Sequence, residues 1–330
     1  MAKELGVVGI GNAIVDVLVQ IDDMFLKKHK LEKGHMTLIE EDEAKNLYQT
    51  MGPAIEMSGG SAANTIAAYA SLGGSSGFIG KVSNDQLGDV FKHDIQSAGV
   101  YFETQPLEDG PPTARSHILV TPDAERTMCT FLGSSVWFSP SDLNQKLIES
   151  AEIIYLEGYL FDRSRAKAAF TIASEIAHTA EKKVALTLSD SFCVQRHREE
   201  FIELVKNHID ILFCNEDEIK TLFETLDLED AVSAIKGCCD LVIITQGSNG
   251  SLIISGDEEL HVPACPVQEI IDTTGAGDLY AAGFLFGYTQ KLPLLTCGKM
   301  GAIAAAEVIQ HLGARVQTDL KNLVNEKLSA

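Results

Sequence analysis

Residues 272–278 read DTTGAGD, and residues 279–286 continue as LYAAGFLF. The second run is apolar on nearly every side of a helix, so it predicts a buried helix. Asp278 is the only charged residue of this helix, and a lone buried carboxylate is costly unless something compensates it. Gly275 and Gly277 let the backbone turn tightly into the helix, whose first N–H groups are free and favour negative charge.

An anion hole beside an acidic side chain suits phosphoryl transfer. The N–H groups would hold the charge that develops on the transferred phosphoryl group, and Asp278 would take the proton of the attacking hydroxyl. The simpler interpretation is an aspartate that caps a buried helix, which is a common arrangement. The local pattern leaves both interpretations open.

The chain has 330 residues, 45% of them hydrophobic and 22% charged, which is close to the globular average and sufficient for a large core. This length predicts one large α/β domain with an accessory element, or two domains. The formal net charge is 26 − 47 = −21, which argues against nucleic acid or an anionic membrane surface as a partner. A phosphate site in so acidic a protein must be built locally, from backbone N–H groups, a metal ion and one or two arginines.

Seven cysteines are scattered along the chain without a C-x-x-C pair, so neither a zinc site nor a disulfide framework is predicted. Most lie in apolar runs and are expected to be small buried residues in a reducing compartment. The first residues show no signal-peptide pattern, and no apolar run approaches the ~20 residues of a membrane span. We therefore expect a cytoplasmic protein without a membrane partner.

The first predicted strand ends in Gly9-x-Gly11, which invites comparison with a dinucleotide-binding fingerprint. Ile14 stands where the third glycine belongs, and the β-branched run 13–21 predicts another strand in place of the required helix. We therefore reject the fingerprint. Asp16 interrupts this apolar strand, where it could face water or accept hydrogen bonds from a ligand hydroxyl.

A second glycine pair, Gly59 and Gly60, precedes a helix predicted over residues 61–72. Ser61 is the expected N-cap, and Asn64 lies one turn into the helix at the same end. The paired glycines would allow a ligand to approach bare backbone. A tight turn between a strand and a helix explains the pattern equally well.

The period of the apolar residues changes to two within residues 110–132, where a turn separates the two strands of a predicted hairpin. With predicted strands at 13–21 and 35–39, the hairpin adds β segments that a regular β–α alternation does not need. We interpret the three segments as a small sheet that covers the active site. Arg115 and Arg126 lie in the hairpin, where either could reach a phosphate or remain a solvated charge.

After residue 150, strands and helices alternate regularly, which predicts parallel strands with helices on both faces and ligands at the carboxyl edge. Asn215 and Glu218 open a helix at that edge and share one face of it, where they could hold Mg²⁺ through water or form a plain capping box. The turn after the next strand, residues 245–250, could admit a nucleotide. The Gly- and Ala-rich helix predicted at 294–311 should pack closely against the helix that follows Asp278.

Three stretches together carry a family resemblance: GGSAAN at 59–64, NEDE at 215–218 and DTTGAGD at 272–278. They resemble the landmarks of the ribokinase (PfkB) family of sugar and nucleoside kinases, and the third is the most specific. The resemblance implies a single domain over residues 1–330. It would be a ribokinase-like three-layer α/β/α domain with a mostly parallel central sheet, covered by a small β-sheet lid built from the inserted segments.

The resemblance also implies ATP-dependent phosphorylation of a hydroxyl group, with Mg²⁺ accompanying ATP and, in many members, a monovalent cation such as K⁺. Within the family the chain is most similar to the branch that phosphorylates the 5′-hydroxyl of adenosine to give AMP. Ribose, fructose, inosine and cytidine are alternative acceptors, and a catalytically weak nucleoside-binding regulator is the alternative to an enzyme. A monomer and a homodimer are both consistent with the composition.

Matching positions carry roles over from the family. Asp278 would be the general base, and Arg126 would approach the phosphates. The anion hole would be formed by Gly275, Ala276 and Gly277. The residues expected to contact the nucleoside are Asn12, Asp16 (on the ribose 2′- and 3′-hydroxyls), Gly59, Gly60, Asn64, Tyr159 and Leu160. Those expected around ATP are Asn215, Thr245, Gly247, Gly250 and Thr274. The metal-binding candidates are Asn215 and Glu218 for Mg²⁺ through water, and Asp272 and Thr274 for K⁺.

Overall fold

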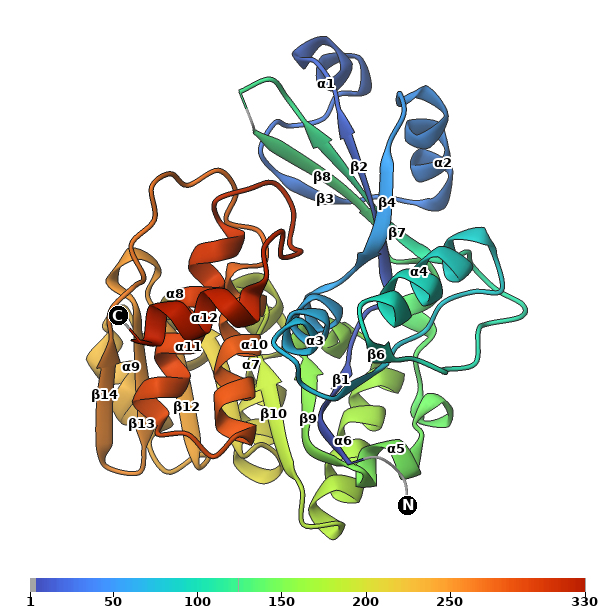
Figure 1. Ribbon diagram of the computed structural model, residues 1–330. Helices are drawn as coiled ribbons and strands as arrows, with labels where there is room; N and C mark the ends of the chain where they lie inside the picture. Colours follow the sequence, from blue (N-terminus) through green and yellow to red (C-terminus); the bar gives the residue numbers. More distant parts are fainter. Residues whose placement is uncertain (1–3, 124, 330) are drawn as a thin grey trace.

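A nine-stranded sheet forms the middle of the molecule, which the computed structural model describes over residues 4–123 and 125–329 (Figure 1). Its strands are β1 (Leu5–Ile10), β5 (Ser76–Ile79), β6 (Val100–Tyr101), β9 (Ala151–Glu157), β10 (Lys183–Thr187), β11 (Ile211–Asn215), β12 (Leu241–Thr245), β13 (Ser251–Ser255) and β14 (Glu258–Val262). They follow the order β14-β13-β12-β11-β10-β9-β1-β5-β6. The ladder from β12 to β6 is parallel, and β13 and β14 are antiparallel at one edge. The predicted mostly parallel sheet is confirmed.

Helices cover both faces of this sheet, so the strands are buried on both sides and read as continuous apolar runs. On one face lie α3 (Ser61–Ser71), α4 (Gln86–Ser97), α10 (Ala276–Thr289), α11 (Leu294–Val308) and α12 (Leu320–Ser329). On the other lie α5 (Gln145–Glu149), α6 (Ser164–Thr179), α7 (Ser191–His208), α8 (Glu216–Phe223) and α9 (Leu228–Ile235). No helix within the described ranges is both long and apolar enough to cross a lipid bilayer.

A second, five-stranded sheet stands beyond the carboxyl ends of the parallel strands (Figure 1). Across this small sheet the strands are β3 (Met36–Leu38), β8 (Arg126–Phe131), β7 (Ala114–Val120), β2 (Ile14–Gln20) and β4 (Ile55–Gly59). The predicted hairpin is confirmed as β7 and β8. Helices α1 (Asp23–His29) and α2 (Glu41–Thr50) pack with the sheet around a small apolar core of their own.

Strand β4 corrects the sequence analysis. The glycine pair at 59–60 predicts a turn between a strand and a helix but does not place that strand in the small sheet, whereas Ile55–Gly59 pairs antiparallel with β2 along its whole length. The small sheet therefore contains a fourth segment besides 13–21, 35–39 and 110–132. It also means that the chain passes directly from the small sheet into α3, because β4 ends at Gly59 and the helix begins at Ser61.

Glycines let α10 and α11 pack closely, as their composition predicts. A Cβ atom at Gly283 would lie 2.5 Å from the carbonyl oxygen of Met300, and one at Gly301 would lie 2.8 Å from that of Tyr280. Since both obstacles are backbone atoms, neither can turn away as a side chain can. Backbone contacts therefore set the distance between α10 and α11.

We expect Gly283→Ala to lower the free energy of unfolding by about 1–3 kcal/mol, because the added methyl group forces two packed helices apart. Urea denaturation followed by circular dichroism measures the change. Lys299→Ala, on an exposed position of α11, is the control and should change the value by less than about 0.5 kcal/mol. Equal midpoints for both variants would contradict the packing argument.

Candidate active site

A cavity of about 640 Å³ lies between the small sheet and the carboxyl ends of the parallel strands. The N-terminal ends of α3 and α10 open into it, and the small sheet supplies Asp16 and several apolar side chains. The predicted site residues that line it are Asn12, Asp16, Gly60, Asn64, Tyr159, Asn215, Glu218, Thr245, Thr274, Gly275, Ala276, Gly277 and Asp278. The fold thus brings most of the predicted residues to one place.

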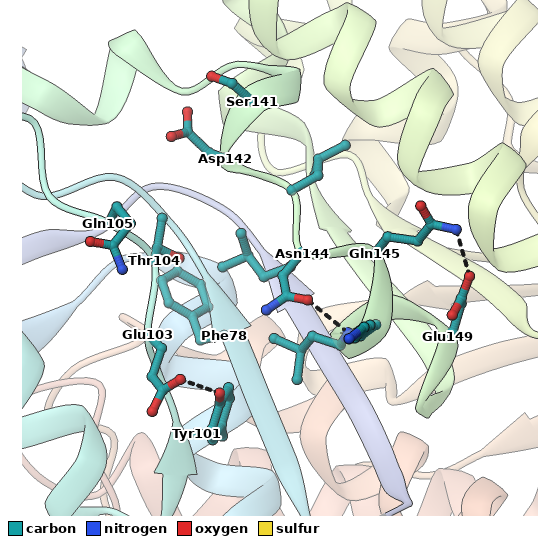
Figure 2. A pocket seen from close by; sticks show the side chains of 14 residues that line it. Phe78, Tyr101, Glu103, Thr104, Gln105, Ser141, Asp142, Asn144, Gln145 and Glu149 are labelled. Atoms are coloured by element: carbon teal, nitrogen blue, oxygen red, sulfur yellow. Dashed lines mark hydrogen bonds between the residues drawn. The ribbon is translucent and has the colours of Figure 1, made fainter. Parts of the chain in front are cut away.

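A second cavity, of about 610 Å³, lies between β6 and α5 and contains none of the predicted site residues (Figure 2). Several of its polar side chains are bonded within the cavity wall. Tyr101 donates to Glu103, Gln145 donates to Glu149 at 2.7 Å, and Asn144 accepts from the N–H group of Leu147. These pairs give the cavity no convergent catalytic groups.

Asp278 lies in the first turn of α10 and faces the first cavity. The N-cap of the helix is Gly275, whose φ of 79° suits glycine, and no side chain caps the helix. Asp278 instead accepts hydrogen bonds from Ser61 Oγ at 2.6 Å and from Asn64 Nδ2 at 3.2 Å. The interpretation of Asp278 as an ordinary helix cap is therefore not what the structure shows.

Burial raises the pKa of Asp278 to about 6, and the bonds from Ser61 and Asn64 and the charge of Arg315 oppose that rise. A carboxyl group whose pKa lies just below neutrality is ionised at pH 7 yet remains basic enough to accept a proton. The group can therefore act as a general base.

Asp16 projects from β2 into the same cavity, so it does not serve only as a solvated residue on a strand. Its carboxylate packs on Gly59, where a Cβ atom would lie 2.4 Å from Asp16 Oδ2. Burial raises the pKa of Asp16 to about 6, Arg315 and Arg126 lower it, and Asp278 raises it. The two carboxylates are thus close enough to interact.

The start of α3 corrects a second prediction. The N-cap is Gly60, with φ of 100°, and not Ser61. Only glycine fits there, because a Cβ atom would lie 2.2 Å from the carbonyl oxygen of Asn12. Ser61 is the first helical residue, and its hydroxyl group reaches Asp278.

Glu157, at the end of β9, links the segment after β1 to the start of α3. Its carboxylate accepts from Asn12 Nδ2 at 2.6 Å, from the Asn12 N–H group at 3.3 Å and from the Ala62 N–H group at 2.8 Å. Burial raises the pKa of Glu157 to about 7 against those hydrogen bonds. The sequence pattern gives Glu157 and Arg315 no role, and it predicts Ser61 only as an N-cap. An acidic residue at the carboxyl end of a buried strand was the available signal for Glu157.

Arg126 and Asp272 form a buried ion pair between β8 and the loop before α10. Asp272 also accepts from the N–H groups of Thr274 and Gly313, both at 3.0 Å. Neither partner lines the cavity. With its oxygens bonded to a guanidinium and two amides, Asp272 is already neutralised, and this arrangement does not fit a K⁺ ion at that carboxylate.

Asn215 and Glu218 form the capping box that the sequence analysis left open. Asn215 donates to the Glu218 carboxylate from its N–H group at 2.9 Å and from Nδ2 at 2.6 Å, and the Glu218 N–H group donates to Asn215 Oδ1 at 2.8 Å. Both residues also line the cavity, and burial raises the pKa of Glu218 to about 7.

Their oxygen atoms fit a magnesium ion held through water, because Mg²⁺ keeps several waters and takes few protein ligands. Across the described part of the chain, no group of three or more His, Cys, Asp and Glu side chains could hold a metal by itself. Any Mg²⁺ here would therefore depend on water and substrate phosphates for most of its ligands.

The remaining predicted residues separate into two groups. Thr245 and Tyr159 line the cavity, whereas Gly247, Gly250 and Leu160 do not. Gly250 serves the turn after β12, where a Cβ atom would lie 2.0 Å from the carbonyl oxygen of Val262. Leu160 is buried in the apolar core behind the sheet.

The site thus combines a carboxylate beside a helix N-terminus with a cavity that a second sheet encloses. The profile of the pfkB family carbohydrate kinases matches residues 40–320. The chain belongs to the PfkB family and has its ribokinase-like fold.

The solved structures include close neighbours of this chain. A crystal structure of adenosine kinase from Sinorhizobium meliloti is 47% identical, with a TM-score of 0.90 over 99% of this chain and 100% of that one. A probable sugar kinase protein from Rhizobium etli CFN 42 is 44% identical, with a TM-score of 0.92 over 99% and 100% of the two chains. Adenosine kinase 2 of Arabidopsis thaliana is 25% identical over 92% of this chain and 94% of its own length.

Glu157→Gln should flatten the pH dependence of stability between pH 4.5 and about 7. Because the pKa of Glu157 is higher in the folded state, the folded protein binds this proton more tightly than the unfolded chain. The contribution of Glu157 to stability is therefore fully present below pH 4.5 and is lost as the pH rises to about 7. The variant removes that term, which has a slope of up to about 1.4 kcal/mol per pH unit. Urea denaturation at several pH values measures it, with the exposed Glu326→Gln as control. A slope equal to that of the wild type would contradict the assignment.

Proposed function

We propose that this protein is an ATP-dependent kinase that transfers the γ-phosphate to the 5′-hydroxyl of adenosine and so produces AMP. The observation that carries the proposal is the Asp278 carboxylate, presented to the cavity at the N-terminus of α10 by Ser61 and Asn64. The similarity to adenosine kinases from a bacterium and a plant supports the choice of acceptor.

The acceptor side of the cavity suits a nucleoside. Asp16 can accept hydrogen bonds from two neighbouring ribose hydroxyls, which a carboxylate does well. The small sheet offers apolar side chains to the base, including Ile118 and Met128, and Tyr159, which follows β9, lines the same cavity. Pockets of a few hundred cubic ångströms with a few polar groups are typical of small-molecule sites.

Asp278 then acts as the general base. Its raised pKa leaves it ionised at neutral pH, and it takes the proton as the 5′-hydroxyl attacks the phosphorus atom. The N–H groups of Gly275, Ala276 and Gly277 lie at the start of the same helix, where they stabilise charge on the transferred group.

Arg126 supports the proposal for the phosphate side. Its Nε and Nη2 atoms are buried without a hydrogen-bond partner in the structure, and such donors are costly to leave unpaired. Because Arg126 is paired with Asp272 and lies outside the cavity lining, a phosphate oxygen would satisfy these donors once the side chain turns toward the cavity. Mg²⁺, held through water by Asn215 and Glu218, would neutralise charge on the β- and γ-phosphates of ATP.

The small sheet acts as the lid in this proposal. It forms one wall of the cavity from strands that belong to no part of the main sheet. Excluding water from the reacting groups favours transfer to the acceptor over hydrolysis of ATP.

A second candidate function is phosphorylation of another sugar or nucleoside by the same residues. The 44% identity to a probable sugar kinase protein supports this second function. Both candidates use Asp278 in the same way, so they differ only in what occupies the space between Asp16 and the small sheet.

An assay of ATP consumption across adenosine, inosine, cytidine, ribose and fructose tests the acceptor. We expect adenosine to give the highest kcat/KM, because its base fills the apolar part of the cavity and its ribose reaches Asp16. A sugar or another nucleoside with a higher kcat/KM would replace adenosine as the acceptor.

Asp278→Asn should lower kcat by about 10²–10⁴ or more, because the amide cannot accept the proton. Adenosine binding, measured by calorimetry, should change little, since Asn keeps the shape of the side chain. Asp89→Asn, at an exposed position of α4, is the control and should retain full activity. For the wild type, kcat/KM should fall as the pH drops through about 6, where Asp278 gains its proton. Undiminished turnover by Asp278→Asn would exclude this residue as the base.

A further inference from the structure

Arg315 lies in the loop between α11 and α12, a segment to which the sequence analysis assigned no function. Its guanidinium donates to the carbonyl oxygen of Ser58 from Nε at 3.2 Å and from Nη2 at 2.6 Å. Nη2 also reaches Ser58 Oγ at 2.7 Å, and Nη1 reaches the carbonyl oxygen of Ala63 at 3.3 Å. A flat guanidinium with several fixed donors suits such a set of acceptors.

These acceptors stand on the two sides of one junction. Ser58 belongs to β4 of the small sheet and Ala63 to α3 of the main domain, and the glycine pair at 59–60 separates them. Ser58 is also bonded to Asp94 of α4. The Asp94 carboxylate accepts from the Ser58 N–H group at 2.8 Å and from the Ser58 hydroxyl at 2.5 Å. Arg315 therefore fastens the place where the chain passes from the small sheet into α3.

The same junction carries the two carboxylates of the cavity. Asp16 packs against Gly59. Asp278 is hydrogen-bonded to Ser61, which lies two residues after Gly59. The charge of Arg315 lowers the pKa of both carboxyl groups, against the effect of burial. Across the described ranges, Arg315 forms no direct ion pair with a carboxylate. Its guanidinium is held by its hydrogen-bond acceptors at the junction, and from there its charge acts on Asp16 and Asp278.

We propose that Arg315 is a positioning residue for phosphoryl transfer, which holds the β4–α3 junction and places one positive charge beside Asp16 and Asp278. This inference rests on the proposed kinase function. The charge favours the ionised form of Asp278, which can accept a proton. The hydrogen bonds of Arg315 keep Gly59 in place against Asp16 and Ser61 in place against Asp278.

Other charges act on the same groups and have to be considered with Arg315. Asp16 and Asp278 interact electrostatically, the charge of Arg126 acts on Asp16, and the charge of Asp94 acts on Arg315. The further groups that interact with Asp278 are Tyr155, Glu157 and Tyr159. None of these residues is substituted in the Arg315 variants, and Arg315→Lys, which keeps the charge, separates the loss of the charge from the loss of the hydrogen bonds.

The pH profile of kcat/KM for adenosine and ATP, measured for the wild type, Arg315→Gln and Arg315→Lys, tests the proposal. Arg315→Gln should move the acid limb to higher pH by about one unit, which is about a tenfold loss of kcat/KM below the limb. Arg315→Lys keeps the charge and should leave the limb within about 0.3 units of the wild type. Because its single ammonium group cannot reach all the acceptors, it should still raise the KM for adenosine several-fold. Arg198→Gln, which removes a half-buried arginine paired with the exposed Glu224 at 2.9 Å, is the control and should change neither value.

Three outcomes would overturn the proposal. These are an acid limb in Arg315→Gln that coincides with that of the wild type, a limb in Arg315→Lys that moves as far as in Arg315→Gln, and a wild-type KM in Arg315→Lys. If Arg315→Gln does not fold, as judged by circular dichroism, the limb and KM of Arg315→Lys still decide the question. A wild-type protein that phosphorylates no member of the acceptor panel would defeat the kinase function itself, which is a distinguishable result.

Discussion

The burial of two negative charges in one cavity is the constraint on which the rest of this structure depends. Asp16 and Asp278 interact, and burial raises the pKa of both. The hydrogen bonds from Ser61 and Asn64 oppose the effect of burial at Asp278, and the charge of Arg315 opposes it at both carboxyl groups. These compensating groups come from separate parts of the chain. The packing of α3 against α10, with Tyr69 and Thr289 bonded at 2.8 Å, brings them together.

The features that could be predicted from the sequence are those with a local physical cause. The parallel sheet follows from apolar runs that alternate with amphipathic helices, and the hairpin follows from a change of period. Asp278 stands out because it is the single charge on an otherwise apolar helix and follows two glycines. The capping box of Asn215 and Glu218 is likewise written in four consecutive residues.

The features that could not be predicted depend on contacts between distant segments. Ser61 and Asp278 are 217 positions apart, and Asn12 and Glu157 are 145 apart, so no local pattern relates them. The place of β4 in the small sheet could not be predicted, because it depends on pairing with the distant strand β2. Arg315 could not be predicted because most of its acceptors are backbone carbonyls of a distant segment, which leave no trace in the sequence.

A net charge of −21 is unfavourable for binding a triphosphate, yet the structure shows how the difficulty can be met. Exposed charges more than a Debye length away, about 8–10 Å in physiological salt, are largely screened, so the total charge matters less than the groups nearest the cavity. Arg126 and Arg315 are both held by the protein close to Asp16, and one of them retains unpaired donors. Desolvation strengthens such nearby charges far more than distant ones. The acidic surface can therefore serve solubility while a few fixed cations and helix N–H groups govern the site.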